Sequence, residues 1–443
     1  MKNEKNLREA HAIKLLFTMS LPVVFFMLIQ VVYNMADVFF LGRTGSNLAV
    51  AAVSLSSPVF SVFSALNTLA GFGGCTAISL ALGKGDRESI KKYSSFVLYF
   101  GLFSGMLLGT AALLFMNQLL SLLGTNAETV ELARDYLRIM AFNAPFAISA
   151  GALANAARAD GESKAMVIAG LSGTFLNIVL DPVLISVLDL GVAGAGYATL
   201  LGNVLSFFMI LISIKKKEGL SISIKDFSMK PEISVKVLSL GVPMAVSTFL
   251  MSFSSTFANR LMVSYGNDAV AVGSVAGKAG MLIVMLVMGI AMGIQPAISY
   301  AYGAGLKDRV KELVTVTGMV NVAVAVVLSA SIFIMRDSFI GVFLADEASL
   351  TLGRRMILGS VLAAPFSAVY QLCSVYLQAT GKVKEATITA LLQKFAVYVP
   401  VLYIMNMMFS LNGLIFAGLV TDAVSTSAAA GLCVRKLSKI RTA

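Results

Sequence analysis

Three carboxylates lie inside long apolar stretches of this 443-residue sequence, and they are the side chains with the clearest chemical potential. They are Asp37, Asp181 and Asp422, whereas the rest of the 23 acidic residues fall in expected loops or at helix ends. An ionisable group within a bilayer is costly unless it faces a partner or a water-filled cavity. Each of the three is therefore a candidate for binding a proton, a cation or a fixed countercharge.

The first two acids have polar neighbours at helical spacing. Asn177 lies one turn before Asp181, while Asn34 and Tyr33 lie three and four residues before Asp37. Carboxylate, amide and hydroxyl oxygens could bind Na⁺, or form a hydrogen-bonded proton acceptor. The same residues could instead be polar contacts between helices. We predict a coupling site for H⁺ or Na⁺ and no cofactor.

The third acid has basic residues at a similar depth. Asp422, Lys278 and Lys394 all lie well inside apolar stretches of the second half of the chain. Charges buried in hydrocarbon usually pair. We predict that one or both lysines neutralise Asp422 and that this charge cluster is mainly structural.

The elements that carry these residues are membrane helices. The chain is 58% hydrophobic and only 13% charged, which indicates an all-α integral membrane protein. Twelve spans are expected, with ends uncertain by several residues, over 13–41, 48–80, 94–116, 131–156, 165–187, 191–214, 234–264, 269–300, 312–335, 352–379, 385–408 and 411–434.

The net charge of +11 does not indicate nucleic-acid binding, because most of the 34 Lys and Arg residues fall in alternate loops and at both termini. This asymmetry places both termini in the cytoplasm, with the protein in the inner (cytoplasmic) membrane. The three cysteines lie in expected helices without metal-ligand spacing, and His11 is the only histidine. A proton relay would have to use carboxylates.

Short motifs recur at a spacing of about 220 residues. Ala144-Pro145-Phe146 returns as Ala364-Pro365-Phe366, and Ala297-Ile298-Ser299 repeats the sequence at 77–79. We predict two six-helix bundles, 1–220 and 234–443, joined by a cytoplasmic linker at 221–233. An even number of spans in each bundle makes the repeats parallel and relates them by a pseudo-two-fold along the membrane normal. Pro22, in the helix of Asp37, is the expected hinge.

These features together resemble the multidrug and toxic compound extrusion (MATE) transporters over nearly the whole chain. The resemblance is carried by LPVVFFMLIQVVYNMADVFFLG at 21–42, by AISYAYGAG at 297–305, by the repeated APF motif and by LNIVLDP at 176–182. It implies two six-helix lobes with alternating access that export drugs against a Na⁺ or H⁺ gradient.

The resemblance also implies a set of site residues. The cation site, where Na⁺ could be held, would comprise Asp37, Asn177, Asp181 and Thr199, with Tyr136 lining the same cavity and Pro22 as the bending point. Tyr33 and Asn34 would line it too. NorM-type members carry acids in helices 7 and 10, which have none here, so the chain resembles the DinF-like and related bacterial branches more closely.

The predicted function is efflux of amphipathic, in particular cationic, organic compounds in exchange for H⁺ or Na⁺, by a monomer. The alternative is a flippase for a lipid-linked oligosaccharide, which would need a lysine unpaired in the cavity. An ion channel or receptor is disfavoured by the duplication, and an enzyme by the lack of a nucleophile-base pair.

Overall fold

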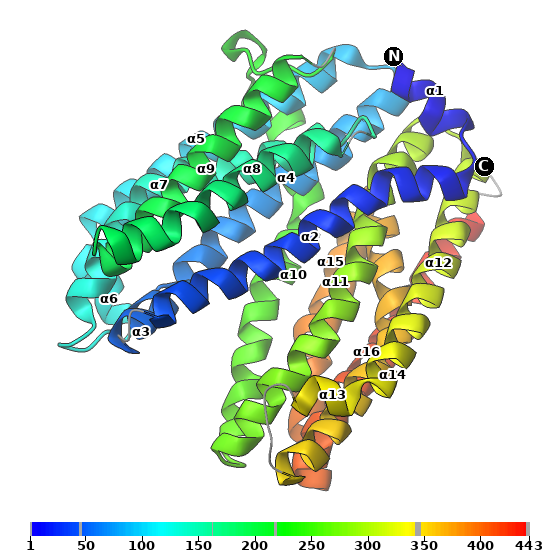
Figure 1. The fold of residues 1–443 in the computed structure, drawn as a ribbon. Helices are drawn as coiled ribbons and strands as arrows, with labels where there is room; N and C mark the ends of the chain where they lie inside the picture. Colours follow the sequence, from blue (N-terminus) through cyan, green and yellow to red (C-terminus); the bar gives the residue numbers. More distant parts are fainter. Residues whose placement is uncertain (1, 44–46, 162, 217–218, 342–346, 440–443) are drawn as a thin grey trace. The chain divides into compact units, whose positions relative to one another are not determined.

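The protein is entirely helices and loops over the residues that its computed structural model describes (Figure 1). These are all residues except 1, 44–46, 162, 217–218, 342–346 and 440–443, and side chains are described except at 2–4, 31–43, 47, 49–50, 267 and 439. The all-α prediction is confirmed.

Sixteen α-helices and three short turns of other helical types follow one another along the described chain. In order they are α1 (Lys2–Glu9), α2 (Ala12–Arg43), α3 (Asn47–Leu55), α4 (Ser57–Lys84), α5 (Arg87–Leu114), α6 (Met116–Leu122), α7 (Val130–Ala157), α8 (Lys164–Asp181), the π-helical turn η1 (Pro182–Val187), α9 (Gly191–Lys215), the 3₁₀ turn η2 (Ile224–Asp226), α10 (Pro231–Val263), α11 (Asn267–Gly303), α12 (Lys307–Ile334), α13 (Arg336–Gly341), α14 (Glu347–Ala379), α15 (Val383–Leu391), the π-helical turn η3 (Leu392–Ala396) and α16 (Tyr398–Lys439).

Eleven helical segments of the described chain are long and apolar enough to cross a membrane. The last of them, Val383–Ser438, has 56 residues, and its backbone leaves the helical conformation at Ser410 (φ 52°, ψ −135°). A helix of about 20 residues crosses the hydrocarbon core, so this segment crosses twice. The predicted twelve spans are therefore confirmed, with the final turn between spans at Ser410.

Two spans contain a π-helical turn, which the sequence did not predict. In η1 the N–H of Leu188 donates to the carbonyl of Val183 at 2.9 Å, and in η3 the N–H of Val397 donates to that of Leu392 at 2.9 Å. Each bond spans five residues instead of four, so one extra residue bulges from the helix. Such bulges often occur at functional sites, and both of these lie next to the polar groups described below.

The chain divides into two compact units, and three helices contribute to both. The first unit comprises Met1–Lys5 and Phe25–Ala245, and the second comprises Asn6–Val24 and Val246–Ala443. The division therefore falls inside α1, inside α2 and inside α10. This division reflects how the helices pack. The predicted boundaries at 220 and 234 describe a sequence repeat instead, and they stay a prediction.

Helix α7 is central to the first unit, where it packs against α4, α5 and α9, and α9 packs in turn against α8 (Figure 1). In the second unit α14 holds the equivalent place and packs against α11, α12 and α16. The polar residues considered below lie on these central helices and their neighbours.

The linker after α9 is attached to α5 in the first unit. The N–H of Ser221 donates to the hydroxyl of Ser94 at 2.9 Å, and the ring of Phe227 stacks on Phe96 at a centroid distance of 6.4 Å. The hydroxyls of Ser95 and Tyr99, which also lie on α5, donate to backbone carbonyls of the linker. The described part of the linker is therefore packed on the first unit.

Candidate functional site

The C-terminal end of α8 carries a buried acid and a buried amide. Asp181 is 0% exposed and Asn177 is 2% exposed, and the two are one helical turn apart. Pro182 follows Asp181 directly and begins the π-helical turn η1. Because proline has no N–H, the regular hydrogen-bond ladder is interrupted immediately after the carboxylate.

Asn177 connects Asp181 to the neighbouring helix α9. Its amide satisfies both neighbours when its nitrogen donates to Asp181 Oδ2 at 3.2 Å and its oxygen accepts from the backbone N–H of Thr199 at 3.0 Å. This orientation is assigned from the hydrogen-bond network, as is usual for Asn and Gln amides. Three of the predicted coupling residues, Asn177, Asp181 and Thr199, are thus brought together.

Small residues permit this proximity of α8 and α9. A Cβ atom on Gly173 would lie 2.3 Å from the carbonyl oxygen of Gly202, and one on Gly202 would lie 3.2 Å from the Cβ atom of Asn177. Small residues let membrane helices approach backbone to backbone. The two glycines therefore set the helix separation at which Asn177 can reach Thr199.

A second polar contact lies one turn further along α9. The amide of Asn203 donates to Asn143 Oδ1 on α7 at 3.0 Å, and Asn143 is only 1% exposed. The sequence analysis did not identify this pair. Its signal was the four-residue spacing of Thr199 and Asn203 in an otherwise apolar helix, which places both on one face.

Tyr136 is buried on α7, but its known neighbours are apolar. Its ring lies 6.0 Å from that of Phe60, and it packs in a cluster with Ile139, Met140 and Val192. A role in lining a drug cavity stays a prediction. The sequence analysis gave no signal for its aromatic partner.

The remaining first-lobe candidates lie on α2. Asp37, Tyr33 and Asn34 fall outside the residues whose side chains the structure describes, so their predicted roles stay predictions. Pro22 is half-buried in α2, two residues before the division between the units at Val24 and Phe25. That position is compatible with the hinge expected there.

The predicted charge cluster of the second lobe is brought together in part. Lys394 and Asp422 interact electrostatically, and Asp422 also accepts hydrogen bonds from Ser367 and Gln393. Lys278 is exposed on α11 and has partners of its own. Whether the cluster is structural is taken up below.

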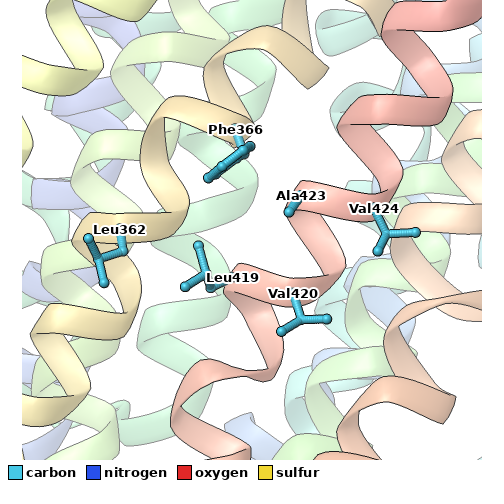
Figure 2. Close-up of a pocket in the computed structure, with 6 residues that line it drawn as sticks. All are labelled: Leu362, Phe366, Leu419, Val420, Ala423 and Val424. Atoms are coloured by element: carbon cyan, nitrogen blue, oxygen red, sulfur yellow. The ribbon is translucent and has the colours of Figure 1, made fainter.

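An apolar pocket of about 430 Å³ lies between α14 and α16 (Figure 2). It is lined by Leu362, Phe366, Leu419, Val420, Ala423 and Val424. Phe366 and Ala423 are the chain neighbours of Ser367 and Asp422. The same two helices thus present an apolar hollow and a polar contact at one level.

Na⁺ would find oxygen ligands in the first unit. The carboxylate of Asp181, the amide oxygen of Asn177 and the hydroxyl of Thr199 are the hard donors that such an ion prefers. Within the described residues no group of three His, Cys, Asp or Glu side chains could hold a metal ion. A cation here would therefore depend on amide and hydroxyl oxygens as well as on carboxylates.

Comparison with known proteins finds similarity along the whole chain. A family model described as MatE matches residues 22–183 and again 243–404, which repeats the spacing of about 220 residues seen in the sequence. The multidrug export protein MepA of Staphylococcus aureus is 32% identical over 417 residues, which cover 94% of this chain and 92% of MepA.

Solved structures share the fold as well. The crystal structure of MATE in the straight conformation has a TM-score of 0.92 at 25% identity and covers 100% of both chains. The structure of MATE in the bent conformation has a TM-score of 0.91 at 25% identity and covers 100% of this chain and 99% of that one.

Proposed function

The chain belongs to the MatE family, and from this we propose that it exports amphipathic organic compounds from the cell by exchange with an inward flow of H⁺ or Na⁺. It is a multi-pass membrane protein of a transporter family. The similarity to a multidrug export protein over 94% of the chain supports several substrates over one. The charge asymmetry supports cytoplasmic termini, and a single chain carries every residue of the proposed site.

The observation that carries the coupling proposal is the burial of Asp181 beside Asn177 and Thr199. A carboxylate with 0% exposure in a membrane helix is costly to keep charged. Binding of H⁺ or Na⁺ removes that charge. The site therefore favours loading from the side where the ion is abundant, and it favours cationic substrates because they can replace the ion.

The Asn177 amide gives the site two states. With Asp181 charged, the amide nitrogen donates to the carboxylate and its oxygen accepts from the Thr199 N–H. If the amide is turned over, its nitrogen lies 3.4 Å from the Thr199 hydroxyl and its oxygen faces Asp181. This second arrangement suits a protonated Asp181, which donates, or Na⁺ shared by both oxygens, although two N–H groups then meet at Thr199.

Coupling is thus a local exchange of hydrogen bonds between α8 and α9. The ion is taken up at Asp181, the Asn177 amide reverses, and the contact that joins the two helices changes from the Thr199 backbone to its hydroxyl. Release of the ion on the cytoplasmic side restores the first arrangement.

The flippase alternative required a lysine unpaired in the cavity, and both candidate lysines have interactions of their own. Lys394 interacts with Asp422, and Lys278 has partners as well. Drug efflux is therefore the better supported function.

The test is transport of a lipophilic cation such as ethidium in proteoliposomes, under separately imposed pH and sodium gradients. We expect one gradient to drive wild-type uptake and Asp181→Asn to lower its rate at least about tenfold, which corresponds to about 1.4 kcal/mol. Asp189→Asn, which changes an exposed acid beyond the same helix, is the matched control. Wild-type rates in Asp181→Asn, or transport that neither gradient drives, would refute the proposal.

A further inference from the structure

The second unit contains a polar centre around Asp422 that differs from a simple buried ion pair. Both carboxylate oxygens accept hydrogen bonds from neutral groups. The hydroxyl of Ser367 on α14 donates to Oδ2, and the amide of Gln393 donates to Oδ1 at 2.9 Å. Neutral donors can satisfy a carboxylate without cancelling its charge.

The countercharge is near but does not make direct contact. Lys394 interacts electrostatically with Asp422, yet none of the ion pairs within 4.0 Å among the described residues joins these two. By contrast, Lys436 on α16 and Glu385 on α15 do form a direct ion pair. The Asp422 carboxylate is therefore balanced from a distance and not by a direct ion pair.

The π-helical turn η3 sets this geometry. Gln393 and Lys394 both lie in it, and the hydroxyl of Ser254 on α10 donates to the backbone carbonyl of Lys394. Gln393 is 5% exposed. The bulge thus turns an amide toward Asp422 and holds the lysine carbonyl to a third helix.

Several buried oxygens near the acid have no protein partner in the described part of the structure. They are Oε1 of Gln393 and the hydroxyls of Thr421 and Ser425, which precede and follow Asp422 on α16 within one turn. Buried polar atoms of this kind are usually satisfied by water. Asp422 itself is only partly buried. The centre is thus equipped for water, which a proton needs to arrive and leave.

We propose that Asp422 is a second proton-binding site, which takes up one proton per transport cycle in addition to the ion bound in the first unit. The proton arrives from the bulk solution through water at the centre and binds a carboxylate oxygen. Its uptake makes the net charge of the centre one unit more positive. A more positive centre disfavours a cationic substrate in the second unit, which couples proton uptake to substrate release.

Among the residues whose side chains the structure describes, few charged or titratable groups face Asp422. They are Lys394 from η3, Tyr370 from α14 and Tyr398 from α16 itself. The Tyr370 hydroxyl donates to the carbonyl of Thr389 at 3.0 Å. An ordinary tyrosine is neutral near pH 7, so Lys394 and Asp422 are the two members of this set that can carry charge there.

The proposal rests on the proposed efflux function, and proton counting tests it. Protons released when ethidium saturates the purified full-length protein in detergent are measured by calorimetry in buffers of different ionisation enthalpy. We expect Asp422→Asn to release one proton fewer than the wild type, and Asp422→Glu to release the wild-type number.

A neutral double variant separates this role from charge balance. Asp422→Asn with Lys394→Gln leaves no unpaired charge, so the protein should regain the wild-type unfolding temperature. If the centre binds a proton, the double variant still releases one proton fewer. Wild-type proton release in the double variant would show that the cluster is only structural. Loss of a proton in Asp181→Asn alone would leave the proposed function intact and overturn this inference. An unchanged count in all variants would also overturn this inference, whereas the proposed function is decided separately by transport under the imposed pH and sodium gradients.

Discussion

Asn177 and Asp181 lie one turn apart on α8 with 3.2 Å between amide nitrogen and carboxylate oxygen, and both side chains are buried. The amide oxygen of Asn177 also accepts from the backbone N–H of Thr199, which no side-chain substitution at Thr199 removes. Substitution of Thr199 therefore leaves its contact with Asn177 in place, whereas substitution of Asn177 removes both contacts. This difference leads to the first prediction.

Asn177→Leu should destabilise the protein by about 1–3 kcal/mol, because it removes the amide that donates to the buried Asp181 carboxylate and accepts from the Thr199 N–H. Thr199→Val should cost less than about 1 kcal/mol, because the backbone N–H is kept. Thermal unfolding in detergent measures both. Equal costs would show that the Thr199 hydroxyl, and not its backbone, is the partner of Asn177 in the resting state.

The glycines between α4 and α10 give a second prediction. A Cβ atom on Gly241 would lie 1.8 Å from the carbonyl oxygen of Leu69, and one on Gly73 would lie 2.0 Å from that of Val237. Gly241→Ala or Gly73→Ala should therefore cost about 1–3 kcal/mol through overpacking. Gly277→Ala is the control, since no atom lies within 4 Å of its Cβ position. Similar unfolding temperatures for Gly241→Ala and Gly277→Ala would contradict the tight contact.

The linker gives a third prediction. Its lysines are exposed, but its backbone is tied to α5 by hydroxyls and by the stacking of Phe227 on Phe96. Phe227→Ala should speed tryptic cleavage after Lys225 severalfold, because cleavage needs local release of the chain. Ile224→Ala, which changes an exposed side chain, should leave the rate unchanged. Rapid cleavage of the wild-type linker would argue that it is not held on α5.

The N-terminus of α5 gives a pH-dependent prediction. Asp86 caps this helix by accepting from the N–H of Ser89 at 3.1 Å, and hydrogen bonds from Ser89 lower the pKa of Asp86. Since the folded-state pKa is the lower one, the cap contributes fully above the unfolded pKa of about 3.9 and is lost as the pH falls through the folded pKa.

Asp86→Ala should therefore lower stability by about 0.5–1 kcal/mol at pH 7 and by much less at pH 3. Asp86→Ser keeps a neutral cap and should show a smaller dependence on pH. Thermal unfolding at the two pH values provides the measurement. A cost of Asp86→Ala that is the same at both values would show that the carboxylate charge does not matter.

The sequence predicted the spans because hydropathy is a property of each segment alone. It placed the final break between 408 and 411, where the backbone turns at Ser410. It also placed Asn177 and Asp181 on one face, since four residues make about one turn. It could not predict the partner of that face, because the approach of α8 to α9 depends on Gly173 and Gly202 meeting across two helices.

The π-helical turns, and the contribution of single helices to both units, also could not be predicted from the sequence. The bulge at Leu392–Ala396 contains no proline or glycine that would have indicated it in the sequence. The charges at 394 and 422 were predicted to meet, and they interact, but the neutral donors Ser367 and Gln393 were not foreseen. Their contacts depend on helices far apart in the chain.

The exchange of α2 and α10 between the two units has a consequence for how the chain could be cut. A polypeptide severed in the linker would yield two fragments, and each would carry a long helix whose one end finishes the bundle built by the other fragment. The two halves, when co-expressed, should then reassemble without a peptide bond between them. Each half lacks a helix end that the other half supplies.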